Sequence, residues 1–153
     1  MERHWYEAGA IPVFRHLELA AHAVLSRKGE GLVALDLRGI SDVTDFFLIA
    51  SGGSDVHVGA LYEGVVEELA AVGLRPLHAE GIDRRRWILL DYVDLVVHLM
   101  LPAAREYYRL EELWNDAPRL EIGPDYFRMP AVRERHPGLT LTRLGGASAG
   151  EET

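Results

Sequence analysis

Side chains that could exchange a proton gather in the middle of the chain. His98 falls in the apolar run 95–100, Asp91 ends the run 86–91, and Glu80 ends the run 74–80. A histidine within hydrogen-bonding reach of a carboxylate can act as a general acid or base. A structural histidine is the alternative, and we favour it because no activated nucleophile accompanies the group. The chain has no cysteine, and Ser51 and Ser54 lack the turn that exposes a catalytic serine.

Histidine spacings offer no metal site. His78-Ala79-Glu80 reproduces the His-x-Glu half of a zinc deaminase signature, but that signature also requires a Pro-Cys-x-x-Cys segment. The seven histidines also lack the paired spacing that places two imidazoles on one helix face around zinc. We therefore expect no metal and no cofactor.

The turn Gly52-Gly53-Ser54 is the main indication of an enzymatic function. It lies between a predicted strand and a predicted helix, where backbone N–H groups and the helix dipole favour an anion. The turn resembles the Gly-Ser of nucleotidyltransferases, which also need two carboxylates alternating on the next strand to hold two metal ions. The run 74–80 supplies only Glu80. A nucleotide-binding enzyme remains the alternative, and our first interpretation is a protein that is not an enzyme.

The balance of charge favours a protein partner over a nucleic acid. The chain has a formal net charge of −8, whereas proteins that bind phosphate backbones cluster lysine and arginine on one surface. The one basic run, Arg84-Arg85-Arg86, lies among aspartates and is interpreted as a solvated hairpin edge, so no direct nucleic-acid specificity is expected. Complementary charge would suit such an acidic protein to a basic protein surface.

The hydrophobic pattern points to a cytoplasmic protein. No apolar run approaches the ~20 residues that cross a bilayer, so no membrane contact is expected. The first residues, Met-Glu-Arg-His-Trp, are polar where a secretory signal would be apolar. The absence of cysteine excludes disulfides.

The first half of the chain reads as helix, two strands and helix. Apolar residues recur at three- and four-residue steps over 13–27, which is typical of a helix with one buried face. The runs 32–37 and 44–51 are rich in aliphatic residues and indicate neighbouring antiparallel strands. A second helix should begin after Ser54, whose hydroxyl can accept a hydrogen bond from an early N–H, and Gly73 should close it.

The second half adds strands and a helix. A right-handed crossover predicts that 74–80 pairs in parallel with 44–51, and the runs 86–91 and 95–100 predict a hairpin. A last helix should start at Pro102 and carry Ala103, Tyr107, Leu110 and Trp114 on one face. The fold class is therefore α/β (α+β), a single domain with a mixed sheet of about five strands flanked by helices.

The domain is expected to span residues 13–122. Residues 1–12 then form an N-terminal extension and 123–153 a C-terminal extension. Prolines punctuate the start of this second extension, and its last part, from Gly145, is small and polar. We expect that last part to be disordered.

Trp87 lies on a strand face that also carries polar groups. Alternation places Trp87, Leu89 and Asp91 on one face of their strand, and the same rule places His98 with Asp94 on one face of the next. One interpretation makes Trp87 a core residue and Asp91 a turn cap. The other makes Trp87 an anchor for a protein partner, since truncating such anchors often costs ~2 kcal/mol or more.

Four motifs follow one another between residues 14 and 122 in a fixed order. They are Leu-Asp-Leu-Arg-Gly-Ile-Ser at 35–41, Thr-Asp-Phe-Phe-Leu-Ile-Ala-Ser-Gly at 44–52, Glu-Gly-Ile-Asp-Arg-Arg-Arg-Trp at 80–87, and Tyr-Tyr-Arg-Leu-Glu-Glu-Leu-Trp at 107–114. Together they resemble the ribosomal silencing factor family, also called the RsfS or Iojap family. This resemblance implies a nucleotidyltransferase-like topology without catalytic residues.

The resemblance also implies a function. A family member would bind the large ribosomal subunit through ribosomal protein L fourteen and keep the small subunit from joining, which is steric inhibition without chemistry. A homodimer is also expected from the family. The resemblance places the partner-binding surface around the sheet and hairpin, with Trp87 and Leu89 as apolar anchors. The polar candidates are Asp91, Asp94 and Glu80, supported by Asp45 and His98.

Overall fold

Residues 12–139 are described by the computed structural model, and they form six strands and six helical segments. In chain order these are α1 (Pro12–Ser26), β1 (Glu30–Asp36), β2 (Phe46–Ser51), α2 (Asp55–Ala70), β3 (His78–Glu80), β4 (Trp87–Asp91), β5 (Leu95–Met100), α3 (Pro102–Tyr108), α4 (Leu110–Leu113), β6 (Arg119–Glu121), the 3-10 helix η2 (Pro124–Arg128) and α5 (Pro130–Arg135). The predictions for residues 1–11 and for the end of the chain from residue 140 lie outside the described part.

The strands form one mixed sheet in the order β3-β4-β5-β2-β1-β6. The predicted antiparallel pair β1–β2 and the hairpin β4–β5 are both confirmed. The predicted parallel pairing of 74–80 with 44–51 is wrong, because β2 pairs in parallel with β5 and β3 pairs with β4 at the sheet edge. The reason is burial. All six residues of β5 are buried, which suits a central strand, whereas β3 has three residues and is largely exposed.

Strand β6 is an element that the sequence pattern did not reveal. It pairs antiparallel with β1 at the second edge of the sheet and brings the count to six strands. Its three residues, Arg119 to Glu121, hold one apolar side chain between two charged ones. An alternation this short carries no usable periodic signal.

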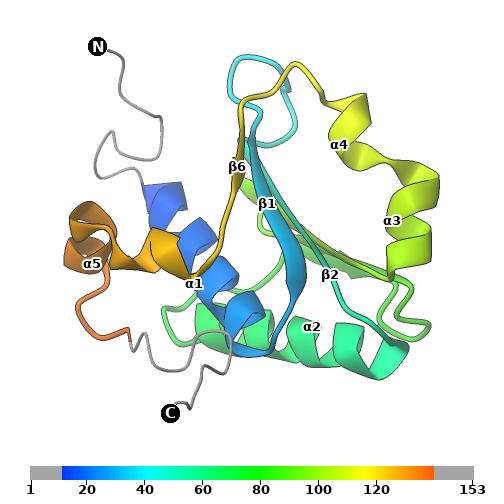
Figure 1. The fold of residues 1–153 in the computed structure, drawn as a ribbon, viewed down its shortest axis with the longest axis horizontal. Helices are drawn as coiled ribbons and strands as arrows, with labels where there is room; N and C mark the ends of the chain where they lie inside the picture. Colours follow the sequence, from blue (N-terminus) through cyan, green and yellow to red (C-terminus); the bar gives the residue numbers. More distant parts are fainter. Residues whose placement is uncertain (1–11, 140–153) are drawn as a thin grey trace.

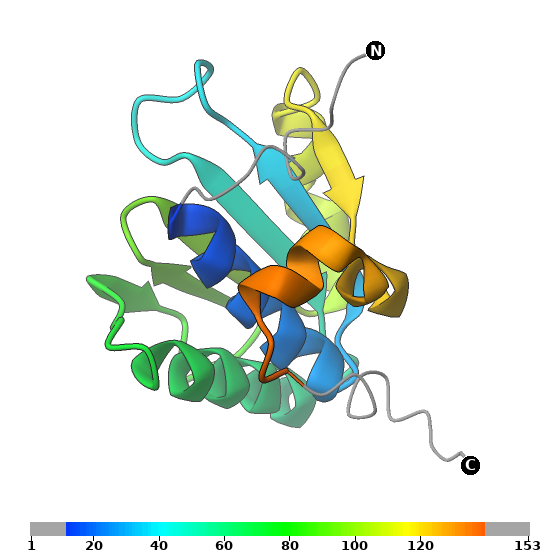
Figure 2. The ribbon, with the colours of Figure 1, turned by 90° about the vertical axis from the view of Figure 1, so that its left-hand side faces the viewer.

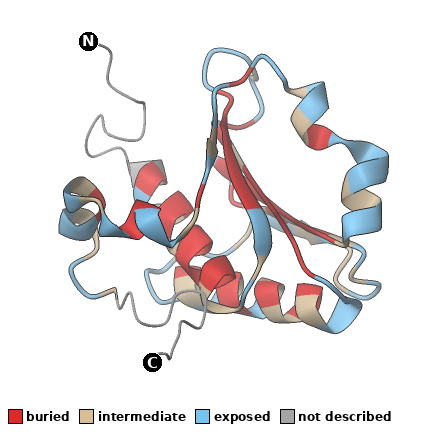
Figure 3. Ribbon diagram, viewed as in Figure 1, coloured by how far each residue is buried: buried red, intermediate tan, exposed pale blue. Residues whose placement is uncertain are grey.

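One face of the sheet is covered by α1 and α2. Figure 1 shows the sheet nearly edge-on, with α1 and α5 to its left and α3 and α4 to its right, and Figure 2 shows α1, α2 and α5 on the near side. The buried residues of this first core come from both helices and from alternate strand positions, among them Leu17, Val24, Leu61, Val65, Leu48, Leu90 and Leu99. Figure 3 shows this continuous buried layer between the helices and the sheet. Among the described residues, no helix is long and apolar enough to cross a membrane.

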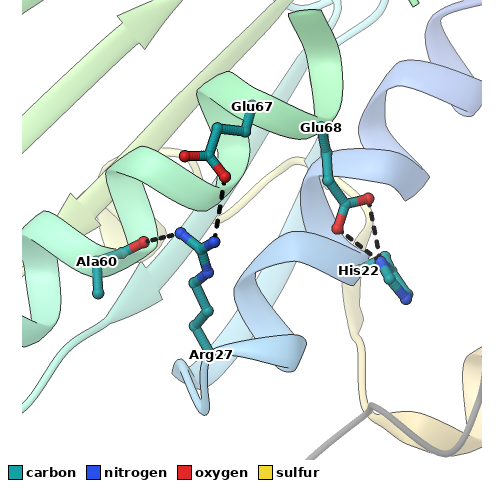
Figure 4. Close-up of polar contacts among 5 residues, drawn as sticks. All are labelled: His22, Arg27, Ala60, Glu67 and Glu68. Atoms are coloured by element: carbon teal, nitrogen blue, oxygen red, sulfur yellow. Dashed lines mark hydrogen bonds and ion pairs between the residues drawn. The ribbon is translucent and has the colours of Figure 1, made fainter. Parts of the chain in front are cut away.

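Polar contacts join α1 and the turn after it to α2 (Figure 4). Arg27, just after α1, donates to the Ala60 carbonyl oxygen at 2.9 Å and pairs with Glu67 at 3.3 Å. The Nδ1 atom of His22 lies 2.8 Å from the Glu68 carboxylate. The exposed Arg27–Glu67 pair contributes ~1 kcal/mol or less, whereas His22 is buried against the apolar layer between the helices.

The segment after Ile122 is held against α1 by a buried carboxylate. Glu18 is fully buried, and it accepts hydrogen bonds from the Tyr126 hydroxyl at 2.5 Å and from Nε of Arg135 at 2.9 Å. Nε2 of His136 lies 2.9 Å from the same carboxylate. Burial alone would raise the pKa of Glu18, but these hydrogen bonds outweigh it and hold the pKa below its ordinary value. The sequence did not indicate where this proline-containing segment lies.

The single helix predicted after Pro102 is wrong in its continuity. Arg109 has φ of 50° and ψ of 55°, and this left-handed residue separates α3 from α4. A non-glycine residue in this conformation costs ~1 to 2 kcal/mol. The four residues predicted to share one face do not all face the sheet: Leu110 is buried and Trp114 half-buried, whereas Ala103 is exposed and Tyr107 is 79% exposed.

Candidate partner-binding site

The second face of the sheet carries the candidate site, and strand alternation puts its residues there. Trp87, Leu89 and Asp91 are half-buried on this face of β4, while the residues between them are fully buried on the other. Leu89 pairs with His98 of β5 in the antiparallel register, and paired residues share a face. The predicted sharing of faces is therefore confirmed.

Trp87 and His98 are joined by a hydrogen bond. The indole N–H of Trp87 donates to Nδ1 of His98 at 3.0 Å. Because an indole nitrogen only donates, Nδ1 carries no proton and the neutral imidazole is protonated at Nε2. Burial lowers the pKa of His98 to about 4, although the negative charge of Glu111 acts in the opposite direction. His98 is consequently neutral at neutral pH.

An acid–base pair of His98 with Asp91 or Glu80 does not form. Nδ1 is occupied by Trp87, and Nε2 has no hydrogen-bond partner within residues 12–139. The geometry therefore fits the structural interpretation of His98, in which the ring orients the Trp87 indole.

Aromatic side chains from β2, from α3 and from the residue after α4 complete this face. The ring of Phe47 lies 4.4 Å from that of His98 and 6.0 Å from that of Trp114, centroid to centroid. The Tyr108 ring lies 4.7 Å from Trp87. We call Phe47, Trp87, His98, Tyr108 and Trp114 the aromatic face. Sequence reasoning named only Trp87 and His98 as site residues. Phe47, Tyr108 and Trp114 belong to the motifs, and Trp114 was also placed on one face of the predicted helix, but no local spacing indicated that their rings meet Trp87 and His98.

Gly81 sets the turn that leads into Trp87. Its φ is 82°, and a Cβ atom at this position would lie 2.0 Å from the Trp87 carbonyl oxygen. Only glycine satisfies both the left-handed backbone and this close approach. The Glu80-Gly81 motif is thus explained by backbone geometry beside the site.

Two of the four candidate carboxylates, Glu80 and Asp91, lie beside the aromatic face. Glu80 is exposed and pairs in register with Leu89, and its carboxylate lies 2.6 Å from Nε2 of His78. Asp91 accepts the Val93 N–H at 2.8 Å, so it does cap its turn while remaining half-buried.

Asp45 and Asp94 meet at the end of the sheet, where β2 and β5 begin. The Asp45 N–H donates to the Asp94 carbonyl oxygen at 3.2 Å. Asp94 is exposed and Asp45 half-buried. The structure therefore groups Trp87, Leu89 and His98 on one surface, puts Glu80 and Asp91 beside them, and sets Asp45 and Asp94 at its end.

The Gly52-Gly53-Ser54 turn offers little to an external anion. The Gly53 N–H donates to Nδ1 of His57 at 2.9 Å, and the His57 N–H donates to the Ser54 hydroxyl at 3.1 Å, which confirms Ser54 as the helix cap. The Gly52 N–H donates to the Met100 carbonyl oxygen. Within the described part of the chain, no cluster of three or more histidine or carboxylate side chains could hold a metal ion.

Comparisons with known proteins give concordant similarities. A family model described as "Ribosomal silencing factor during starvation" matches residues 12–139. A protein from Halalkalibacterium halodurans named Ribosomal silencing factor RsfS is 42% identical over 106 residues, which cover 69% of this chain and 91% of the relative. A crystal structure of a Chromobacterium violaceum protein is similar with a TM-score of 0.67 and 33% identity, covering 69% of this chain and 88% of that one.

The name of a mouse relative refers to the large ribosomal subunit. It is named Mitochondrial assembly of ribosomal large subunit protein 1 and is 39% identical over 75 residues. The match covers 47% of this chain and 33% of the mouse protein. The similarity is thus confined to one part of that longer protein.

Proposed function

The chain belongs to the ribosomal silencing factor family, and we propose that it binds the large ribosomal subunit through ribosomal protein L fourteen and keeps the small subunit from joining. Its mechanism is steric: a folded body on the joining surface excludes the competing subunit, so no bond is made or broken. The place of action is the cytoplasm.

The observation that carries this proposal is the aromatic face with its adjoining carboxylates. Aromatic residues such as Trp, Tyr and Phe are enriched at the cores of protein interfaces, and polar groups surround those cores at the rim. In the proposed complex, Trp87 and Leu89 supply apolar anchors. Glu80 and Asp91 pair with basic groups of the partner, and the net charge of −8 steers the encounter.

The remaining site residues have secondary roles in the proposal. His98 orients the Trp87 indole through their 3.0 Å hydrogen bond. Asp45 and Asp94, at the end of the sheet, extend the acidic surface. An interface of standard size buries ~800 Å² per partner, an area that a domain of this size can supply.

Co-sedimentation with purified large subunits tests the proposal. The full chain should sediment with the particles at modest ionic strength, and added salt should weaken binding because part of the attraction is electrostatic. In a second measurement, light scattering should show that the chain slows association of large and small subunits. The proposal fails if the full chain stays in the supernatant or if it binds without affecting subunit association.

Trp87 can be tested in the same assay with two variants. Trp87→Ala removes the ring, and it should weaken binding at least tenfold if Trp87 is an anchor. Trp87→Phe keeps most of the apolar ring but loses the donor to His98. Undiminished sedimentation of both variants would remove Trp87 from the proposed interface.

A further inference from the structure

Helices α3 and α4 expose apolar side chains to solvent while burying almost none. Within α3 no residue is buried, and within α4 only Leu110 is, as Figure 3 shows at the right of the sheet. Yet Tyr107 is 79% exposed, Tyr108 51% and Leu113 71%. The rings of the two tyrosines are in edge-to-face contact with centroids 4.9 Å apart. We call Tyr107, Tyr108 and Leu113 the outer patch.

The outer patch is continuous with the aromatic face. The centroid of the Tyr108 ring lies 4.7 Å from that of Trp87, and the Trp87 indole N–H donates to the buried His98. A partner that approaches from solvent therefore meets Tyr107 and Tyr108 before it reaches the half-buried Trp87. Scattered exposed apolar residues are ordinary, whereas a patch joined to an apolar face is typical of an interaction surface.

Contacts beneath α3 hold the outer patch in place. Arg105 donates to the Glu111 carboxylate through Nε at 2.9 Å and Nη2 at 2.6 Å, which joins α3 to α4 across the left-handed residue. Nη1 of Arg105 also donates to the Ser51 hydroxyl at 3.0 Å, at the end of β2. Because these contacts exist before any partner arrives, little ordering cost falls on binding.

The charge around the outer patch selects a basic partner. Residues 102–116 include four carboxylates and two arginines. Both arginines are in ion pairs, Arg105 with Glu111 and Arg109 with Glu106 and Glu112. The segment thus has a negative balance, and a cation from a partner can lie over a tyrosine ring while a nearby carboxylate attracts it.

We infer that the outer patch is the first and principal contact with the basic surface of a large-subunit ribosomal protein, and that α3 and α4 position its side chains for this contact. This inference rests on the proposed function. In this inference Tyr107, Tyr108 and Leu113 make the largest share of the contact, while Trp87 remains an anchor and also contacts Tyr108 from beneath.

The test replaces the two most exposed members together, as Tyr107→Ala with Leu113→Ala. Both side chains face solvent, so the thermal unfolding midpoint should remain that of the unmodified chain. Val56→Ala is the matched control, because Val56 is 70% exposed on α2, which covers the opposite face of the sheet. In co-sedimentation with purified large subunits, the double variant should bind about tenfold more weakly or worse, and the control should bind like the unmodified chain.

The outcomes separate this inference from the function on which it rests. If the unmodified chain does not sediment with large subunits, the proposed function fails. If the unmodified chain sediments and the double variant binds as tightly as the control, the outer patch is not the principal contact although the function stands. If light scattering shows a dimer that the double variant abolishes while ribosome binding persists, the patch contacts a second copy, and our assignment of its partner is overturned.

Discussion

The buried imidazole of His98 should make folding stability fall as the pH is lowered from 7 to 5. In the folded chain, Nδ1 must stay unprotonated to accept the Trp87 indole N–H. Protonation would place an N–H on Nδ1 that faces the Trp87 indole N–H, so neither group could accept. It would also place a positive charge on a residue that is 3% exposed. The folded state therefore resists a proton that the unfolded state accepts.

The size of the effect follows from the two pKa values. His98 has an ordinary value of 6.5 in the unfolded chain and about 4 when folded. Because the folded pKa is lowered, the stability from neutral His98 is fully present above pH 6.5 and is lost as the pH falls toward 4. With ~1.36 kcal/mol per pKa unit, the complete loss is about 3 kcal/mol, and about 2 kcal/mol of it is lost by pH 5.

Urea unfolding of the full chain and of His98→Asn at pH 7 and pH 5 measures this loss. The Asn amide oxygen can accept from Trp87 in place of Nδ1, but it does not titrate. Between the two pH values the full chain should lose about 2 kcal/mol more unfolding free energy than the variant. Glu18 and Glu111, whose pKa values are lowered from 4.5, are present in both proteins and largely cancel.

Equal pH dependence in the two proteins would refute this reasoning. It would mean that His98 is accessible to protons in the folded state, or that the Trp87 bond does not fix its tautomer. In that case the difference in unfolding free energy between the full chain and His98→Asn would be the same at pH 7 and at pH 5.

Three further predictions concern other parts of the molecule. Glu18→Ala should lower the unfolding free energy by about 3 to 5 kcal/mol, because it leaves the buried Arg135 guanidinium without its carboxylate; in urea unfolding, exposed Glu134→Ala is the control, and equal midpoints would contradict the role of Glu18. Gly81→Ala should lower the thermal midpoint by several degrees, since a Cβ would lie 2.0 Å from the Trp87 carbonyl oxygen; an unchanged midpoint would count against that backbone. Calorimetric titration with ATP and magnesium should give no heat of binding, because the Gly53 N–H already donates to a side chain; micromolar binding would revive the enzyme alternative.

Local periodicity was enough to predict much of the candidate site. Trp87 and Leu89 share a face because side chains alternate along any strand, whatever lies beside it. In the same way, the Ser54 cap depends on a hydroxyl beside the first free N–H groups of the same helix, and both features are confirmed in the structure. Such interactions join residues a few positions apart, so the residue types alone specify them.

Competition between distant segments decided the rest. Strand β5 lies in the centre of the sheet beside β2 because five of its six residues are apolar and all six are buried there. Strand β3 is therefore left at the edge. The left-handed Arg109 ended α3 and redirected the chain into α4, where Leu110 is buried, while Tyr107 on α3 remains in solvent. Neither result has a local signal, because each depends on the free energy of packing against residues far away in the chain. The sequence by itself therefore determined the family, most of the elements and the residues of each strand face, whereas only the tertiary structure decided which aromatic rings meet and which remain exposed.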